Sequence, residues 1–336
     1  MGEWVDSAMG RRIGREGARE RHPRSDARPQ LGARASALAV GAVLLLLGAC
    51  REATAPAPYV DLSVRQPLPQ ASSEVPTPLH LGVAGVVSPQ GTLEDYAPLA
   101  EYLGRHLGRP VELVQRRTYA EVNDLIARRA VDVAFVCTSA YVAGRREFGM
   151  RLLVAPEVRG KAEYRSLLIV PVDSPARSMA DLRGKVFAFT DPMSNTGRLY
   201  PTSLVMALGE TPETFFQRTF WTYSHDDAVR AVADGLADGA GVDSLVYDAM
   251  VAREPRLGTR TKIIHRSPPF ASPPVVVSPD VHPALRDTIQ ELLLGLDSDA
   301  DGRSVLTELG VDRFVVIEDA AYASVRALEA TVNPEP

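Results

Sequence analysis

From residue 79 onward, short apolar runs alternate with stretches in which apolar residues recur every three or four positions. The run LHLGVAGV predicts a strand, and the following LEDYAPLAEYLGRHLG places Leu99, Leu103 and Leu107 on one face of a helix. Strand–helix alternation is typical of α/β folds with mainly parallel sheets covered by helices. The first series predicts strands at 79–86, 110–115, 131–136, 151–155 and 164–172, and helices at 93–108, 119–130 and 138–147.

The same alternation starts again after residue 172. A chain of 336 residues is too long for one ordinary core, so two successive units indicate two α/β lobes. In open α/β sheets, ligands bind beyond the carboxyl ends of strands, which directs attention to the junctions where a strand gives way to a helix. The second series predicts helices at 179–184, 197–208, 225–237 and 244–254, strands at 185–190, 218–223, 238–242 and 261–267, and a last helical part at 282–331.

The N-terminal segment follows a different pattern. Residues 35–49, ASALAVGAVLLLLGA, carry no charge and are too short for a typical membrane span, but they fit the core of a signal peptide. The ending LGAC resembles a bacterial lipobox, which implies removal of residues 1–49 and a lipid on Cys50; an ordinary secretory signal with a chance cysteine is the alternative. The proline-rich residues 50–78 then read as an extended linker.

Composition limits the classes of partner. Apolar residues at 45% and charged residues at 24% are typical of a soluble globular protein. Without residues 1–49, which hold eight arginines and five acidic residues, the chain has 29 basic and 37 acidic residues and a net charge of −8. This balance argues against nucleic acid as a partner and requires any anion site to be local. Cys137 is the only cysteine besides Cys50, so a mature monomer has no internal disulfide, and the setting VDVAFVC indicates a buried thiol.

The segment DPMSNTG, residues 191–197, joins a predicted strand to a predicted helix. The first turn of a helix presents N–H groups without helical partners at the positive end of the dipole. An oxyanion could accept those N–H groups together with the hydroxyls of Ser194 and Thr196, and Gly197 would permit close approach. Simple capping of the helix by Ser or Thr is the structural alternative.

A second junction lies in YSHDDAVRAVADGLADGAGVDS, residues 223–244. His225 opens a predicted helix, where the dipole disfavours the charged imidazolium and a neutral N–H could meet a ligand oxygen. Asp243 follows the next strand, again at a carboxyl end. A lone histidine more often has a structural role, so this element is informative mainly in combination with the first.

Together, DPMSNTGRLYP and SHDDAVRAVADGLADGAGVDS resemble the phosphate/phosphite/phosphonate-binding proteins of bacterial ABC importers. YAEVNDLIARRAVDVAFVCTSAYVAG and HRSPPFASPPVVV add to the resemblance, which covers roughly residues 79–325. It implies a type II periplasmic-binding fold of two lobes, each a mixed sheet flanked by helices, with the ligand in the cleft between them. The lobes would comprise residues 79–170 plus 275–331 and residues 171–274.

The resemblance also implies site residues. The family binds its oxyanion on a Ser-Thr-Ser-like run, which here is Ser194-Asn195-Thr196, with Asn195 as a departure. The implied ligand-binding set is Tyr119, Tyr164, Ser194, Asn195, Thr196, His225, Asp243 and Ser272. Relatives that take aminoalkyl phosphonates place acids near the amine, and one such position falls near Ser272, which favours phosphate, phosphite or a simple alkylphosphonate.

Other site types are less well supported by the sequence. DSDADGRSVLTE fits the EF-hand calcium pattern with Asp297, Asp299, Asp301 and Glu308, but Ser304 stands where an apolar residue is usual, which favours a solvated turn. Ser194, His225 and Asp243 could be read as a hydrolytic triad, yet no GxSxG elbow is present. No nucleotide-binding loop or zinc pattern occurs, so no cofactor is expected.

The interpretation is therefore a lipid-anchored, extracytoplasmic solute-binding protein of an ABC importer, monomeric, without catalytic activity, that closes on a phosphorus oxyanion and delivers it to a permease. A ligand-sensing lipoprotein of the same fold, serving a separate signalling partner, is the main alternative. A phosphoester hydrolase is the third.

Overall fold

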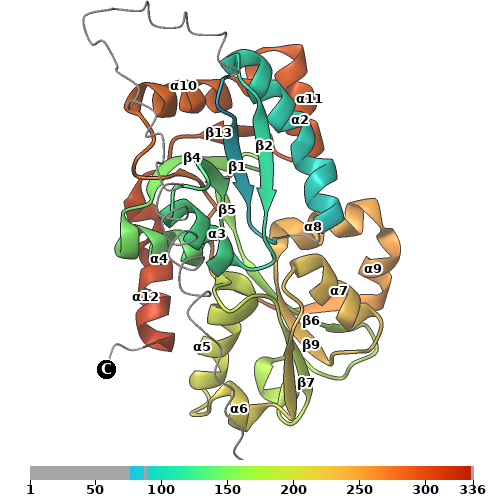
Figure 1. The fold of residues 1–336 in the computed structure, drawn as a ribbon. Helices are drawn as coiled ribbons and strands as arrows, with labels where there is room; N and C mark the ends of the chain where they lie inside the picture. The colour runs from blue at the N-terminus through green and yellow to red at the C-terminus, as the bar shows by residue number, and fades with distance from the viewer. Residues whose placement is uncertain (1–75, 87–88, 334–336) are drawn as a thin grey trace, which may run out of the picture. The chain divides into compact units, whose positions relative to one another are not determined.

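Two β-sheets organise the described residues of the computed structural model, which are 76–86 and 89–333 (Figure 1). The expectations for residues 1–49, for Cys50 and for most of the linker lie outside the described residues. The first sheet has the order β13-β4-β12-β3-β1-β2. Its strands are β1 (Leu79–Val83), β2 (Val111–Gln115), β3 (Val133–Phe135), β4 (Arg151–Glu157), β12 (Val275–Val277) and β13 (Arg313–Val315).

The second sheet is built from the middle of the chain and has the order β10-β6-β9-β7-β8. A separate two-stranded sheet, formed by β5 (Glu163–Tyr164) and β11 (Phe270–Ala271), lies in the two segments that cross from one large sheet to the other. The strands of the second sheet are β6 (Ser166–Pro171), β7 (Val186–Phe189), β8 (Arg218–Trp221), β9 (Gly239–Asp243) and β10 (Thr261–Arg266).

The expectation of mainly parallel sheets is wrong, whereas the mixed sheets that the resemblance implies are present. β1 pairs in parallel with β2 and β3, and β7 with β8 and β9. The remaining pairs of the two large sheets are antiparallel. The cause is the crossing of the chain between sheets: β12 enters the first sheet from the second and runs antiparallel to both of its neighbours, β3 and β4.

The first crossover also lies earlier than expected. β6 pairs with β9 and β10, so it belongs to the second sheet, and the expected boundary at residue 171 falls one strand too late. The turn before it contains Arg159 and Gly160, both with positive φ. The two lobes are therefore residues 79–157 with 275–332, called lobe 1 below, and residues 166–266, called lobe 2, joined by 158–165 and 267–274.

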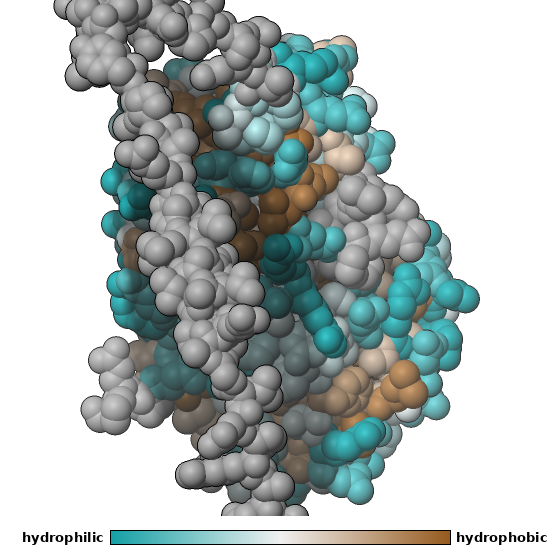
Figure 2. All heavy atoms as spheres, in the orientation of Figure 1, coloured by the Kyte–Doolittle hydropathy of each residue, from teal (hydrophilic) through white to brown (hydrophobic). Residues whose placement is uncertain are grey.

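Helices cover both faces of each sheet, as expected when the strands are almost entirely apolar. In β6, Leu167 and Ile169 pack with residues of α7, whereas Leu168 and Val170 pack on the opposite face. On the face shown in Figure 2, hydrophilic side chains cover most of the described surface. The helices of lobe 1 are α2 (Pro89–Leu107), α3 (Tyr119–Ala127), α4 (Thr138–Phe148), α10 (Pro283–Leu294), α11 (Ala300–Leu309) and α12 (Ala323–Val332), and those of lobe 2 are α5 (Tyr200–Met206), α6 (Pro212–Phe215), α7 (His225–Ala233), α8 (Ser244–Arg253) and α9 (Pro255–Arg260).

The segment with the calcium-like pattern is helical. Asp299 caps α11, because its Oδ1 accepts the N–H of Gly302 at 2.7 Å. Its Oδ2 accepts the Tyr102 hydroxyl at 2.9 Å. An EF-hand needs an open loop in which Asp297, Asp299, Asp301 and Glu308 converge on one ion. The EF-hand alternative does not fit this segment, and no cluster of three or more possible metal ligands occurs within residues 76–86 and 89–333. None of the described helices is both long and apolar enough to cross a membrane.

Candidate functional site

The segment that follows β7 forms the centre of the candidate site. Ser194 is the N-cap of a π-helical turn, Asn195–Leu199, that continues into α5, and its hydroxyl oxygen accepts the N–H of Gly197 at 3.0 Å. Ser194, Asn195 and Thr196 are fully buried. The first N–H groups of a helix have no intrahelical acceptor. Within the described residues, those of Asn195 and Thr196 form no hydrogen bond to a backbone oxygen, and the N–H of Asn195 faces the sulfur of Cys137.

Several side-chain oxygens at or beside this turn are buried without a hydrogen bond. They are Oδ1 of Asn195, Oγ1 of Thr196 and, against Gly197, Oγ1 of Thr190. Oγ of Ser272, in the second crossover, is also buried without one. Native proteins pair nearly all buried polar atoms, since an unpaired one costs about 1–3 kcal/mol. The unpaired hydroxyl of Thr196 beside helix N–H groups suits a ligand that accepts hydrogen bonds, whereas the amide oxygen of Asn195 can only accept one.

Two glycines let the 195–206 segment lie directly against its sheet. A Cβ on Gly197 would lie 1.8 Å from Oγ1 of Thr190, and one on Gly241 would lie 2.3 Å from Cγ of Pro201. The close approach expected for Gly197 is thus made to Thr190, at the end of β7. As a result, the helix N-terminus is held at the carboxyl edge of the second sheet.

His225 is the first residue of α7 and is buried. Its Nδ1 accepts the backbone N–H of Asp243 at 3.0 Å, so in the neutral ring the proton is on Nε2. Burial lowers the pKa of His225 to about 4, despite the opposing effect of Asp226, and the imidazole is neutral at pH 7. Nε2–H is therefore a neutral donor, the form expected from the sequence.

Asp243 follows β9 and caps α8. Its Oδ1 accepts the N–H of Leu245 at 2.7 Å and the N–H of Val246 at 3.4 Å. Burial raises the pKa of Asp243 to about 7, although these two hydrogen bonds act in the other direction. Near neutral pH, the carboxyl group can therefore either accept a proton from a ligand or carry one of its own.

The two tyrosines approach the site from lobe 1 and from the first crossover. The Tyr164 hydroxyl lies 2.6 Å from Oγ1 of Thr138 and accepts Nδ2 of Asn195 at 3.1 Å, so it links both lobes. Tyr119 is buried, and burial raises its pKa well above the usual value, which keeps its hydroxyl protonated. Tyr164 therefore positions Asn195, while the Tyr119 hydroxyl has no hydrogen-bond partner among the described residues.

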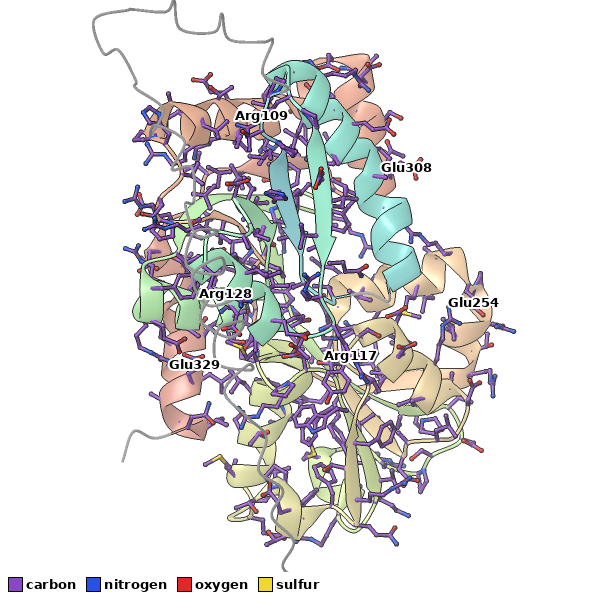
Figure 3. The ribbon with its side chains drawn as sticks, in the orientation of Figure 1. Arg109, Arg117, Arg128, Glu254, Glu308 and Glu329 are labelled. Carbon is purple, nitrogen blue, oxygen red and sulfur yellow. The ribbon has the colours of Figure 1, made fainter. Side chains whose placement is uncertain are left out.

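Further contacts hold the lobes together around this site. The N–H of Tyr119 donates to Asp191 Oδ2 at 3.1 Å, and the N–H of His225 donates to the carbonyl of Val86 at 3.0 Å. The guanidinium of Arg117, labelled in Figure 3, lies 4.1 Å from the ring centre of Tyr223. All eight residues expected at the site are buried. Hydrogen bonds join Tyr164 to Asn195 and His225 to Asp243, whereas Ser272 bonds only to Ala162 and Tyr322 among the described residues.

Sequence reasoning did not assign three other polar residues of this junction. Asp191 accepts the N–H of Tyr119 and of Met193, and burial raises its pKa. Thr138 meets Tyr164, and the Ser139 hydroxyl donates to the carbonyl of Met193. Their position in the sequence could have indicated them, because each lies just after a buried strand and ligands bind beyond the carboxyl ends of strands in α/β sheets.

The hydrolytic triad is not formed. A triad requires the histidine Nδ1–H to donate to a carboxylate while Nε2 accepts the serine hydroxyl proton. Here Nδ1 of His225 instead accepts the backbone N–H of Asp243, and the Ser194 oxygen is a helix cap. This arrangement suits binding of an anion and gives no activated nucleophile.

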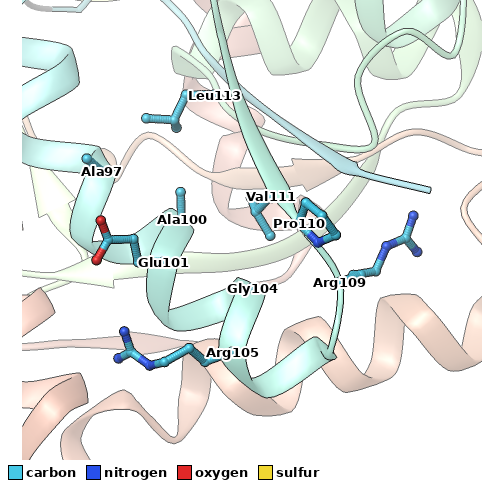
Figure 4. A pocket seen from close by; sticks show the side chains of 9 residues that line it. All are labelled: Ala97, Ala100, Glu101, Gly104, Arg105, Arg109, Pro110, Val111 and Leu113. Carbon is cyan, nitrogen blue, oxygen red and sulfur yellow. The ribbon is translucent and has the colours of Figure 1, made fainter. Parts of the chain in front are cut away.

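A pocket of about 700 Å³ lies elsewhere, between α2 and β2 on lobe 1 (Figure 4). Its walls are mostly apolar, with Arg105 and Arg109 among the lining residues. Arg105 forms an ion pair with Asp301 at 3.3 Å, and Arg109 donates to the carbonyl of Pro78 at 3.2 Å. Both guanidinium groups therefore already have partners in lobe 1 or beside it.

Comparison with known proteins agrees with this geometry. A family model described as the periplasmic substrate-binding protein of phosphonate ABC transporters matches residues 81–322. The phosphate-import protein PhnD of Mycolicibacterium smegmatis is 27% identical over 208 residues, which cover 59% of this chain. The match spans 65% of that relative's length, somewhat less than two thirds.

Solved structures show the same fold. A binding protein component of an ABC phosphonate transporter from Pseudomonas aeruginosa has a TM-score of 0.72 at 21% identity, covering 76% of this chain and 86% of that one. PhnD1 from Prochlorococcus marinus, solved with methylphosphonate, has a TM-score of 0.70 at 16% identity and covers 77% and 99%. The expected two-lobed, type II periplasmic-binding-protein fold is confirmed.

Proposed function

Because the chain belongs to the family of periplasmic substrate-binding proteins of phosphonate ABC transporters, we propose that it binds a phosphorus oxyanion between its two lobes and delivers it to an ABC permease. The unpaired polar atoms at the start of the 195–199 turn carry this proposal. Buried N–H groups, hydroxyls and a neutral imidazole are donors, and a tetrahedral oxyanion offers several acceptors.

The proposed contacts use donors from lobe 2 first. The N–H groups of Asn195 and Thr196 and the hydroxyls of Ser194 and Thr196 surround the oxyanion, and Nε2–H of His225 meets another oxygen. The Tyr119 hydroxyl donates from lobe 1, and Ser272 donates from the second crossover. Asp243 accepts a hydrogen bond from a protonated P–OH group, since Oδ2 is not used in capping α8.

Binding is proposed to act by hinge closure without chemistry. Contacts between the lobes, such as Arg253 to Asp95 at 3.0 Å, support a closed state, for which the two crossovers are proposed as the hinge. Closure buries the oxyanion and exposes a single compact surface to the permease. A monomer suffices for this cycle.

The protein is proposed to work outside the cytoplasm, tethered by a lipid on Cys50, as the LGAC ending suggests. Families of this kind are described as periplasmic. The proline-rich residues after Cys50 would give the two lobes reach from the membrane surface.

The proposed ligand lacks an ammonium group. Ser272 is neutral and buried, and Asp243 is the only acidic residue of the eight expected at the site. Its Oδ1 caps α8 and its Oδ2 is assigned to the P–OH group. Phosphate, phosphite and methylphosphonate fit this site better than aminoethylphosphonate does, because an ammonium group would have to compete for that single carboxyl group.

Titration calorimetry on the protein without residues 1–49 tests the proposal. Phosphate, phosphite, methylphosphonate, aminoethylphosphonate and sulfate are compared at the same pH and ionic strength. We expect saturable binding of at least one of the first three, and weaker binding of aminoethylphosphonate. Absence of binding by every phosphorus oxyanion would overturn the proposal.

A further inference from the structure

Cys137 lies inside the junction that closes around the proposed oxyanion. It ends the run that contains β3, it is buried, and it occupies the N-cap position of α4. Its thiol makes no capping hydrogen bond, unlike the Ser194 hydroxyl on the other side of the junction. A position at a strand's carboxyl end and a helix's start is normally occupied by a polar side chain.

The sulfur lies between the two lobes. The backbone N–H of Ser139, in α4, and the backbone N–H of Asn195, in lobe 2, both face it. The N–H of Asn195 is one of the donors proposed for the oxyanion, so the thiol lies next to the space a ligand would fill. A second observation marks the same turn: Oγ1 of Thr196, the residue next to Asn195, is buried without a hydrogen-bond partner and can donate to a ligand.

The thiol is neutral and only weakly polar. Burial raises the pKa of Cys137, so it remains S–H at pH 7 and does not repel an anion by charge. A buried thiol acts as a small apolar group with a weak donor, whereas a serine hydroxyl in its place would be a full donor. An oxygen atom that faced the sulfur would therefore lose hydrogen-bond energy relative to water.

The other proposed donors give two hydrogen bonds to each of three oxygens, with one to spare. Asn195 and Thr196 supply two N–H groups, His225 supplies an imidazole N–H, and the four hydroxyls are those of Tyr119, Ser194, Thr196 and Ser272. Phosphate carries four oxygens on phosphorus, whereas phosphite and methylphosphonate carry three and place hydrogen or methyl in the fourth position. The weakly polar thiol of Cys137 can therefore accommodate the fourth substituent on phosphorus when that substituent is hydrogen or methyl.

We propose that Cys137 contacts the bound ligand and determines its specificity, favouring a phosphorus oxyanion whose fourth substituent is hydrogen or methyl over inorganic phosphate. This inference rests on the proposed function, because it assigns the ligand class of the same site. The inference adds Cys137, from lobe 1, to the proposed ligand contacts. The sequence alone indicated only that this thiol is buried.

The test compares Cys137→Ser and Cys137→Ala with the unsubstituted protein by titration calorimetry, using phosphate, phosphite and methylphosphonate. The unsubstituted protein is expected to bind phosphite or methylphosphonate more tightly than phosphate. Cys137→Ser supplies a hydroxyl to the fourth oxygen and should raise phosphate affinity relative to methylphosphonate by about tenfold or more. Cys137→Ala is the matched control, and it should not raise phosphate affinity.

Two results would overturn the inference while leaving the proposed function intact: tighter binding of phosphate by the unsubstituted protein, or an unchanged phosphate-to-methylphosphonate ratio in Cys137→Ser. Failure of all three anions to bind the unsubstituted protein would remove both proposals. If Cys137→Ser does not fold, methyl methanethiosulfonate can be used to attach S–CH3 to the native thiol, with modification of Cys137 verified by peptide mass spectrometry. The modified protein should lose methylphosphonate binding, and undiminished binding would contradict contact with Cys137.

Discussion

Two helix N-termini lie at the same edge of the second sheet. One has no carboxylate at its cap and is called open below, and the other has one and is called filled. β7 and β9 are parallel neighbours, so the helical segments that follow them begin side by side. The segment at 195 is capped by the neutral hydroxyl of Ser194, whereas α8 is capped by the carboxylate of Asp243. The second N-terminus thus already holds an anion from its own chain, and the first does not.

The N-terminus of α3 on lobe 1 supports the same distinction. Thr118 and Glu121 form a capping box there, and the carboxylate of Asp191 accepts the N–H of Tyr119 from across the junction. A helix dipole favours an external anion only when no internal carboxylate occupies the same N–H groups. The comparison therefore locates the proposed oxyanion at 195–196, and the predictions below alter one side of it at a time.

The largest effect is expected when the open N-terminus is made to resemble the filled one. Ser194→Asp places a carboxylate at the cap, where Asp243 has one at α8. Two like charges about 4 Å apart at an effective dielectric near 20 repel by about 4 kcal/mol, so affinity should fall roughly a thousandfold. Aspartate is a good N-cap, and thermal melting should show a folded protein.

Calorimetry and thermal melting on the same Ser194→Asp sample separate the two interpretations of this residue. Normal affinity for the best-bound phosphorus oxyanion would show that Ser194 is only a helix cap and that the ligand lies elsewhere. The reciprocal substitution, Asp243→Ser, removes the carboxylate from the cap of α8 and should not impair folding of the 195–206 segment.

A smaller loss is expected from a single buried hydroxyl at the open N-terminus. Thr196→Val removes Oγ1 and retains both the shape and the backbone N–H. A hydrogen bond to a charged group contributes about 1.5–3 kcal/mol, so affinity should fall about tenfold to a hundredfold. Calorimetry with the ligand that binds best measures the change.

Thr202 provides the control for that substitution. Its Oγ1 is also buried without a hydrogen bond, but it lies in α5, beyond the 195–199 turn where the oxyanion is proposed to bind. Thr202→Val should leave affinity unchanged, and its stability should be equal or higher, since an unpaired hydroxyl is removed. Equal losses of affinity in the two variants would mean that the ligand does not contact Thr196.

The filled N-terminus should make binding depend on pH. The pKa of Asp243 is about 7, so its carboxyl group gains charge as pH rises from 6 to 8. Affinity for an oxyanion should therefore fall over this interval in the native protein relative to Asp243→Asn. If ligand binding raises the pKa of Asp243 by one further unit, the ratio of the native affinity to that of Asp243→Asn changes by about tenfold. Taking this ratio cancels the titration of the ligand itself. A ratio that stays constant from pH 6 to 8 would contradict contact between Asp243 and the ligand.

The same substitution gives a stability signature of defined sign. A pKa raised from 3.8 to about 7 in the folded state means that the folded protein binds the extra proton between these values. The difference in unfolding free energy between the native protein and Asp243→Asn should therefore favour the native protein most below pH 4 and decline as pH rises to about 7. The lowered pKa of His225 acts in the opposite direction but is present in both proteins.

The sequence predicted the strand-to-helix junction at 190–197 better than it predicted the sheets. A strand, a Pro-containing turn and a helix start are local signals, and the role of Ser194, Asn195 and Thr196 in binding stays a prediction. The antiparallel entry of β12 and the placement of β6 in the second sheet depend on pairing between distant segments, which local periodicity does not encode. Cys137 was identified as buried, but nothing local could show that Asn195 approaches it from the other lobe.

The smallest effect is expected at the residue that departs most from the Ser-Thr-Ser-like run. Asn195→Ala keeps the backbone N–H that faces the site and removes the amide that donates to the Tyr164 hydroxyl at 3.1 Å. If Asn195 contributes mainly through its backbone, affinity should fall by only about threefold, within the range of one neutral hydrogen bond. A double-mutant cycle with Tyr164→Phe sharpens the result, because residues that act through one shared contact have non-additive effects. The double variant should then lose no more than the worse single variant. Additive losses, or a loss in Asn195→Ala as large as that in Thr196→Val, would place the amide group itself on the ligand and make Asn195 a direct contact of the open N-terminus.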